Sequence, residues 1–419
     1  MQEMRLKLET YINQYLELWD FYGVIQVKRK GEVLFENAYG YASLEFGIRN
    51  EMNSRFSLAS VSKQFTAFAI LLLHERHLVD IDASAQLYLP PELNIDDSIT
   101  IHHLLSHTSG LYNFYNFESD FFAGYNRMNY SQTDFFRLYF DKPVKPPGTV
   151  YDYNNANYNL LAWIIEYVSG ETYADFIRNQ LFLPLGMTDS DVDDGCKPIR
   201  NKSSNYVKDF DATIKSPYYN EKFSIGAGAV VSTCDDLYKW YACLRDRKIL
   251  SRETYARFFN RNKNNYCYGL EYRQLRGTNQ YGHGGDHLGI STYVQYDFGE
   301  DICILILSNN EAINQYRLGD AISKILNHMD VEAPVKREEV VVEENKLHEY
   351  CGTYLKDKIR VERINGKLYF TRFSGNLHIE IYPVGDGLFA RRYSDQIEPY
   401  RFIKNDKGEM TFFGYPKLD

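Results

Sequence analysis

The pattern of apolar residues changes after Lys346, and this change most constrains how the 419-residue chain can fold. From Gly352 onward, short stretches alternate apolar and polar side chains, and turn sequences such as Asn365-Gly366 separate them. Strands at such regular spacing predict a small antiparallel barrel or sandwich over residues 347–419. Residues 331–346 are rich in charge and lack periodicity, so we interpret them as a linker.

Residues 1–330 mix helical and strand patterns, which predicts an α/β body. The stretches Gly23–Val27 and Glu32–Tyr39 alternate around Lys30-Gly31, which indicates a hairpin. We expect an antiparallel sheet, built from this hairpin and strands after Tyr266 and flanked by the terminal helices. Residues 80–205 are mainly helical in pattern and predict a second subdomain, with the active site in the crevice between the two. The other expected elements are helices within Met1–Asp20, Ser60–His77 and Asn314–His328, and strands Ser291–Tyr296 and Asp301–Leu307.

The charge and composition exclude several functions. The formal net charge is −9 and no basic face is visible, so we expect no nucleic-acid partner. The apolar runs are too short to span a membrane, and the N-terminal stretch has no charged head before an apolar core, which favours a cytoplasmic location unless a leader was removed. The six cysteines form no CxxC pair and do not cluster with histidine, so we expect reduced thiols and no metal site.

The first candidate site element is Ser60-Val61-Ser62-Lys63, at the start of an apolar helix. Residues three apart lie on one helix face, so the serine and the lysine side chains can meet. A lysine with a low pKa could take the serine's proton and activate it as a nucleophile. The ordinary alternative is a serine that caps the helix and a lysine in solvent.

The second element is Tyr153-Asn154-Asn155. A tyrosine near two cations can have a depressed pKa and serve as a general base, and an asparagine amide can orient a substrate carbonyl. A polar loop before a helix over Leu160–Val168 is the alternative.

The third element is His283-Gly284-Gly285, ahead of Asp286. Glycines there let the backbone approach a substrate closely and offer N–H groups to an oxyanion. In isolation, a glycine-rich turn with one satisfied histidine is the default interpretation of the segment.

The order of the three elements resembles the serine β-lactamase and penicillin-binding-protein superfamily, whose SxxK, YxN and KTG-like elements follow one another in this way. The chain is most similar to the class C β-lactamase-related branch, which includes esterases, D-aminopeptidases and D-Ala-D-Ala carboxypeptidases. The similarity spans about Tyr22 to His328, and the C-terminal part is similar to the lipocalin-like domain of some members. The segments that support it are Leu104–Leu111, Pro184–Ser190, Gly226-Ala227-Gly228 and Ser232-Thr233.

The resemblance implies a role for each matching residue. Ser60 would be the nucleophile and Lys63 its proton acceptor or relay, and Tyr153 would share the acid and base work by protonating the leaving group. Asn155 would hold the acyl side chain of the substrate. His283 and Gly285 stand at the first and last KTG positions, and the N–H groups of Ser60 and Asp286 would form the oxyanion hole. The implied acyl transfer needs no metal and no cofactor.

Two positions depart from the β-lactamase pattern. His283 replaces a lysine, which removes a permanent charge that would recognise a substrate carboxylate and help to depress the tyrosine pKa. This replacement is typical of the esterase and D-aminopeptidase branches. Asp286 places a carboxylate beside the oxyanion hole, where it could bind a substrate amine.

We therefore expect a serine hydrolase that acts on an ester or amide substrate, either a small molecule or a peptide, with D-amino-acid peptides included. A penicillin-binding protein, a weak β-lactamase or a D-Ala-D-Ala carboxypeptidase is the first alternative. A non-catalytic binding protein on the same fold is the second. Aromatic residues of Asn113–Asn129 could line a hydrophobic wall or simply pack, the C-terminal domain could shape the cleft or mediate oligomerisation, and the sequence leaves a homo-oligomer open.

Overall fold

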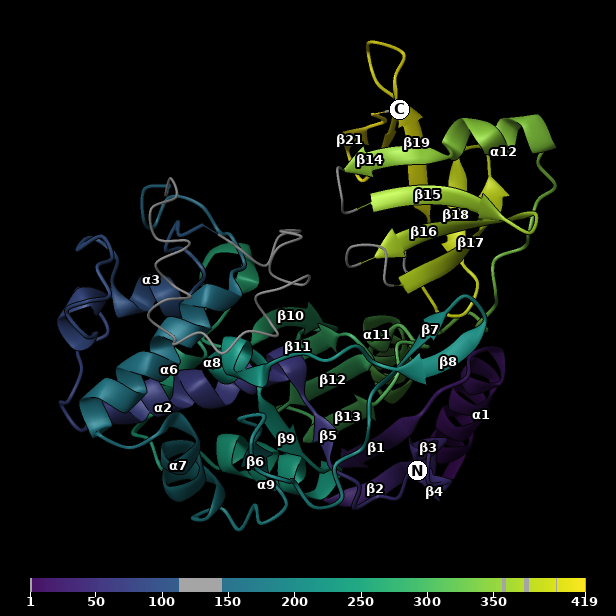
Figure 1. Ribbon diagram of the computed structural model, residues 1–419. Coiled ribbons are helices and arrows are strands. Elements are labelled where there is room, and N and C mark those ends of the chain that lie inside the picture. Colours follow the sequence, from purple (N-terminus) through teal and green to yellow (C-terminus); the bar gives the residue numbers. More distant parts are fainter. Residues whose placement is uncertain (1, 113–144, 356–358, 373–376, 397, 419) are drawn as a thin grey trace.

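The computed structural model describes residues 2–112, 145–355, 359–372, 377–396 and 398–418. Figure 1 shows an α/β body followed by a separate β domain at the C-terminal end of the chain. The loop Asn113–Asn129, for which a hydrophobic wall was considered, lies outside the described residues.

The body is built on a six-stranded antiparallel sheet with the order β10-β11-β12-β13-β1-β2. The hairpin β1–β2 is the predicted one, and it joins the later strands through β13, which confirms the expected sheet. Every residue of β12 and β13 is buried, because helices cover both faces of the sheet there. The strands are β1 (Gly23–Arg29), β2 (Glu32–Tyr39), β10 (Glu271–Leu275), β11 (Thr278–His287), β12 (Ile290–Asp297) and β13 (Ile302–Ser308).

Two hydrophobic clusters hold helices against the sheet. The N-terminal helix α1 (Gln2–Leu18) and the helix α11 (Gln315–Leu326) pack side by side on one face, as the sequence predicts for the terminal helices. The opposite face packs against α2 (Lys63–Glu75) and α9 (Cys234–Arg245). Residues 65–73 of α2 are all buried, so this helix lies in the centre of the body.

The remaining elements of the body pack around this arrangement. The helices are α3 (Ile101–Leu105), α6 (Asn155–Ser169), α7 (Tyr173–Ile177), α8 (Ile225–Gly228) and α10 (Arg252–Phe258), with single turns at η1 (Ala59–Ser62), η2 (Ala85–Tyr88), η4 (Arg178–Phe182), η5 (Glu221–Ser224) and η6 (Lys263–Asn265). The short strands are β3 (Tyr41–Ser43), β4 (Ile48–Arg49), β5 (Phe56–Ser57), β6 (Asp191–Val192), β7 (Tyr206–Asp209), β8 (Ala212–Lys215) and β9 (Val230–Ser232).

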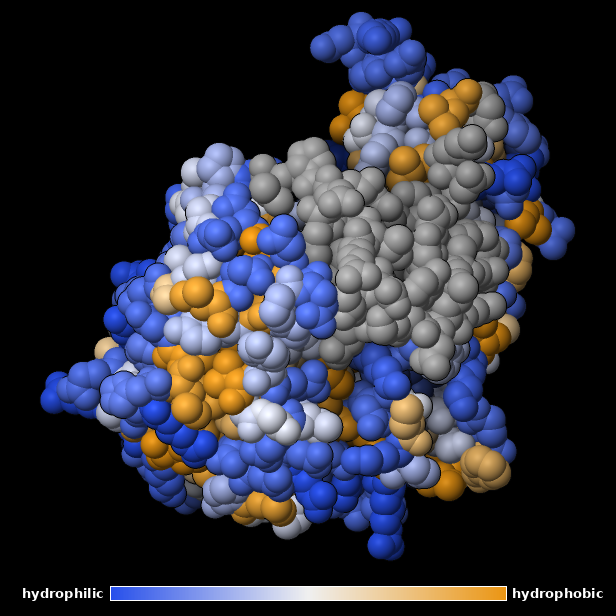
Figure 2. Space-filling model, turned by 60° about the vertical axis from the view of Figure 1, so that its left-hand side comes forward, coloured by the Kyte–Doolittle hydropathy of each residue, from blue (hydrophilic) through white to orange (hydrophobic). Residues whose placement is uncertain are grey.

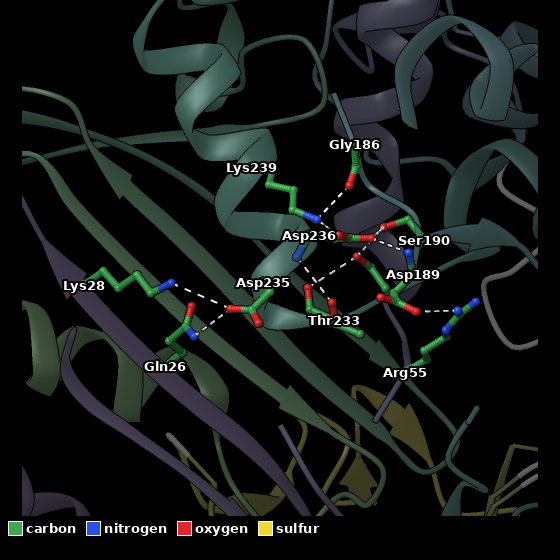
Figure 3. Close-up of polar contacts among 11 residues, drawn as sticks. Gln26, Lys28, Arg55, Gly186, Asp189, Ser190, Thr233, Asp235, Asp236 and Lys239 are labelled. Carbon is green, nitrogen blue, oxygen red and sulfur yellow. Dashed lines mark hydrogen bonds and ion pairs between the residues drawn. The ribbon is translucent and has the colours of Figure 1, made fainter. Parts of the chain in front are cut away.

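Buried Asp236 links two of the supporting sequence segments, because its backbone N–H donates to Oγ1 of Thr233 at 3.2 Å and its carboxylate binds residues of Pro184–Ser190 (Figure 3). It accepts hydrogen bonds from the backbone N–H of Asp189 at 2.7 Å and from the Ser190 hydroxyl at 2.9 Å. Lys239 donates to the same carboxylate at 2.7 Å and to the carbonyl of Gly186 at 2.7 Å. These segments therefore tie α9 to the loop before β6, which is a structural role.

The C-terminal domain is an antiparallel meander of eight strands in sequence order, which confirms the predicted barrel. Its first and last strands come together, since the N–H of Leu418 donates to the carbonyl of Thr353 at 2.7 Å, so the barrel is nearly closed. Aromatic rings fill its interior, and those of Phe402 and Phe412 stack with centroids 4.2 Å apart. The strands are β14 (Gly352–Leu355), β15 (Ile359–Ile364), β16 (Lys367–Arg372), β17 (Leu377–Gly385), β18 (Leu388–Arg391), β19 (Tyr400–Lys404), β20 (Met410–Phe412) and β21 (Tyr415–Pro416).

The segment 331–346, predicted as a linker, ends in a helix. Residues 330–343 contain no helix or strand, but α12 (Glu344–Tyr350) begins before residue 346. This helix forms because Leu347 and Tyr350 pack onto the aromatic core of the barrel, a contact that the local sequence does not reveal.

The face formed by the helices of the body presents hydrophilic and hydrophobic residues side by side, as Figure 2 shows. Within the described ranges, the structure has no helix long and apolar enough to cross a membrane.

Candidate active site

Ser60 and Lys63 meet at the junction between η1 and α2. Ser60 lies in the η1 turn, and Lys63 is the first residue of the α-helix that follows. The Lys63 Nζ atom is 2.9 Å from the Ser60 Oγ atom. Ala59, just before the serine, has a φ of 45°, a backbone conformation that non-glycine residues rarely adopt and that concentrates at functional sites.

Lys63 is completely buried and has three polar neighbours. Besides Ser60, its Nζ atom lies 2.7 Å from Oδ1 of Asn155 and 2.9 Å from the carbonyl oxygen of Ala227. Burial lowers the pKa of Lys63 well below the usual lysine value, because the charged form loses its hydration. A neutral amine has two N–H donors and one lone pair. Asn155 Oδ1 and the Ala227 carbonyl can only accept, so the lone pair is left for the Ser60 hydroxyl.

Tyr153 lies over this pair, with Lys63 Nζ 4.9 Å from the centre of its ring. Burial raises the pKa of Tyr153 above its ordinary value, and a hydrogen bond with Ser60 opposes that rise. The depressed tyrosine pKa considered from the sequence is therefore wrong. The reason is that the nearby bases, Lys63 and His283, have lowered pKa values and supply little positive charge.

His283 is buried on β11, next to Tyr153. Its Nε2 atom lies 3.1 Å from the hydroxyl of Tyr266, and its Nδ1 atom lies 2.6 Å from the carbonyl oxygen of Gly284. Burial is the main cause that lowers the pKa of His283 to about 3. The imidazole is therefore neutral at physiological pH, and it can orient a hydroxyl group but cannot supply a fixed charge.

Gly285 allows β11 to pass directly beside the serine turn. A Cβ atom at this position would lie 2.1 Å from the carbonyl oxygen of Leu58, so only glycine fits. This contact brings the backbone of the next residue, Asp286, toward the turn that carries Ser60. The Asp286 side chain is exposed at the end of β11.

The structure thus brings five of the predicted residues (Ser60, Lys63, Tyr153, Asn155 and His283) together, with Gly285 against the serine turn. Asn155 differs from its expected role, because its Oδ1 atom contacts Lys63. Its remaining amide group is the part that can contact a substrate.

The sequence reasoning assigned no role to His107 and Tyr266, which complete the aromatic surroundings of Tyr153. The His107 ring is buried, with its centroid 4.3 Å from that of Tyr153 and 4.7 Å from that of Tyr266. Its Nδ1 atom accepts from the backbone N–H of Asn154 at 3.2 Å, which fixes the Tyr153 loop. His107 belongs to the supporting segment Leu104–Leu111, which was the only sequence signal for it.

Comparisons with known proteins find relatives and structures that are similar to this chain. Penicillin-binding protein 4* of Bacillus subtilis (strain 168) is 28% identical over 449 residues, which cover 99% of this chain and 97% of that protein. The structure of the octameric penicillin-binding protein homologue from Pyrococcus abyssi superposes with a TM-score of 0.69 at 22% identity, over 98% of each chain. The D-amino acid amidase from Ochrobactrum anthropi SV3 gives a TM-score of 0.64 at 22% identity, over 76% of this chain and 99% of that one.

These two structural likenesses show the fold. The family is shown by a family model described as Beta-lactamase, which matches residues 16–326 and so includes the serine turn, the tyrosine loop and β11. The chain therefore belongs to the Beta-lactamase family of serine-hydrolase-type proteins.

Proposed function

We propose that the protein is a serine hydrolase that forms an acyl-enzyme on Ser60 from ester or amide substrates. The observation that carries the proposal is the completely buried Lys63 amine, 2.9 Å from the Ser60 hydroxyl and with a lowered pKa. A neutral amine in this place is a general base that needs no metal or cofactor.

The proposed reaction has two halves. Lys63 takes the proton of Ser60 as Oγ attacks the carbonyl carbon, and the N–H groups of Ser60 and Asp286 stabilise the oxyanion. The C–O or C–N bond then breaks, and the protonated Tyr153 hydroxyl donates to the leaving group while Lys63 returns its proton to Tyr153. In the second half, water attacks the acyl-enzyme by the same route in reverse.

The charges near the site favour substrates that carry an amine over substrates that carry a carboxylate. Neutral His283 offers no cation at the position where β-lactamases have lysine. Asp286 places an exposed carboxylate one residue beyond Gly285, and the Arg391 guanidinium also interacts electrostatically with it. A substrate with a free amino group, such as a D-amino-acid amide or peptide, fits this pattern, and one structural neighbour is a D-amino acid amidase.

A penicillin-binding function is the second candidate. It is favoured by the Bacillus subtilis relative, a penicillin-binding protein whose similarity extends over both domains of this chain.

Intact-mass spectrometry tests both candidates. The protein is incubated separately with a fluorophosphonate and with a labelled penicillin, and the Ser60→Ala variant is the control. A fluorophosphonate adduct that Ser60→Ala lacks supports the hydrolase, and persistent acylation by penicillin moves the assignment to a penicillin-binding protein. A folded wild-type protein that gains neither adduct contradicts both and leaves a non-catalytic protein on the same fold.

The proposal extends to self-association, because an octameric homologue matches 98% of this chain. Light scattering coupled to size-exclusion chromatography tests it. A monomeric mass at all concentrations would contradict a homo-oligomer.

A further inference from the structure

The turn between β11 and β12 carries the chain away from the proposed oxyanion hole, and it is held from several sides. Leu288 and Gly289 form the turn, two and three residues beyond Asp286. The Ser216 hydroxyl donates to the Leu288 carbonyl at 3.0 Å, and the Gly289 N–H donates to Oε1 of Glu311 at 3.0 Å. These bonds fix the backbone of the turn within the body.

The C-terminal barrel contributes an apolar contact to the same turn. Leu377, the first residue of β17, is buried and forms one hydrophobic cluster with Leu288 and with Val207 of β7. Ile214 of β8 and Ile379 of β17 extend this cluster. The turn therefore lies between the β7–β8 hairpin and the barrel.

The barrel is also joined to the hairpin itself by backbone and ring contacts. The N–H of Phe210 donates to the carbonyl of His378 at 2.9 Å, and the N–H of His378 donates to Oδ1 of Asp209 at 2.8 Å. The rings of Phe210 and His378 stack with centroids 4.2 Å apart. Figure 1 shows β7 and β8 directly below β17, so the hairpin connects the barrel with the edge of the site.

We propose that Leu377 and His378 of the C-terminal barrel are positioning residues for acylation. Through Leu288 and the β7–β8 hairpin they hold the β11–β12 turn in place. The turn in turn positions the Asp286 N–H, which would donate a hydrogen bond to the oxyanion. Oxyanion donors act only when they are preorganised, and a displacement of about 1 Å can cost on the order of 10²-fold in rate. This inference rests on the proposed hydrolase function.

A second set of barrel contacts separates positioning from simple attachment. The Asp395 carboxylate accepts from the Tyr15 hydroxyl at 2.6 Å and lies 3.2 Å from Nη1 of Arg317. These partners are on α1 and α11 and not on the β11–β12 turn. Loss of this carboxylate weakens the attachment of the barrel and leaves Leu377 against Leu288.

The test is the rate at which a fluorophosphonate adduct forms on Ser60 in the full-length chain. We expect Leu377→Ala to slow the adduct about tenfold, and Leu377→Met, which restores the apolar contact, to recover most of that loss. His378→Ala, whose side chain lies outside the barrel core, should also slow it. Asp395→Asn should label at the wild-type rate while lowering the melting temperature.

The possible results distinguish a failure of this inference from a failure of the proposed hydrolase function. Wild-type rates for both Leu377→Ala and His378→Ala would overturn the inference and leave the hydrolase intact. If Asp395→Asn slowed adduct formation equally, the effect would come from the general attachment of the barrel to the body, and the inference would also be overturned. A wild-type protein without any adduct would instead remove the proposed function. If Leu377→Ala fails to fold, His378→Ala decides the question.

Discussion

Lys63 shows why residue identity and environment must be considered together. The spacing from Ser60 predicts that the two side chains meet, and the structure has them 2.9 Å apart. The sequence could not predict that Asn155 and the Ala227 carbonyl would occupy the other two sites on the amine. Those contacts come from segments more than 90 residues away, and burial of the amine in the folded chain favours its neutral form.

The protonated state of Tyr153 leads to a prediction about leaving groups. A phenol with a raised pKa is suited to donate a proton, and amines need that proton more than activated phenolates do. We expect Tyr153→Phe to reduce kcat/KM for an amino-acid p-nitroanilide by about 10²–10⁴-fold. The loss for a p-nitrophenyl ester should be much smaller, and equal losses for the two substrates would contradict the role as acid.

His283 makes the protein sensitive to acid. Its pKa is lowered to about 3, against an ordinary histidine value of about 6.5, so only the unfolded chain takes up this proton between these pH values. The contribution of His283 to the free energy of unfolding should therefore be fully present above pH ~6.5. Below that pH it should fall by up to about 1.4 kcal/mol for each pH unit.

Urea unfolding at several pH values measures this slope, with His283→Gln as the comparison. The variant should lose less stability between pH ~6.5 and ~3, because one proton-binding group is removed. The same slope in both proteins would show that His283 does not contribute.

At the scale of elements, the contact between β11 and the serine turn gives a sharp test. Gly285→Ala places a Cβ 2.1 Å from the Leu58 carbonyl oxygen, so the strand must move away from Ser60. We expect adduct formation to fall by at least about 10²-fold, as for the loss of an oxyanion donor. Gly299→Ala is the matched control, since its Cβ has an ordinary 3.5 Å neighbour, and it should label normally. Normal labelling of Gly285→Ala would contradict the close approach.

The pair Asp235 and Asp236 tests the structural role of the segments in Figure 3. Asp236→Ala removes a buried acceptor of three hydrogen bonds and should cost about 3–5 kcal/mol of unfolding free energy. Its neighbour Asp235 is mostly exposed and 3.7 Å from Lys28, so Asp235→Ala should cost no more than about 1 kcal/mol. Urea titration of both variants measures the difference, and equal costs would argue against the buried network.

Elements with a clear local pattern could be predicted from the sequence, and those that depend on distant packing could not. The alternation around Lys30-Gly31 is enough for the β1–β2 hairpin, and the apolar run Ile302–Leu307 is enough for β13. The helix α12 could not be predicted, because it is stabilised by the packing of Leu347 and Tyr350 against the barrel core. His107 was without a role because its ring meets Tyr153 and Tyr266 only in the folded chain.

For the whole molecule, the sequence predicts two parts but not how they meet. Regular strands after Gly352 predict the barrel, and the motif order predicts the body. The contacts of Leu377 and His378 with β7 join residues about 170 positions apart, as the Asp209–His378 bond shows, and no local pattern contains that information. The division at residue 330 stays a prediction.

In the proposed mechanism Lys63 acts as a neutral base toward Ser60, and this role sets how the acylation rate depends on pH. The rate of fluorophosphonate adduct formation would be measured across pH by intact mass, within the range where the protein stays folded. We expect the acidic limb of the rate to lie well below the ordinary lysine pKa of about 10.4 and to be lost in Lys63→Ala. A rate that rises only through the ordinary lysine pKa, or that survives in Lys63→Ala, would contradict it.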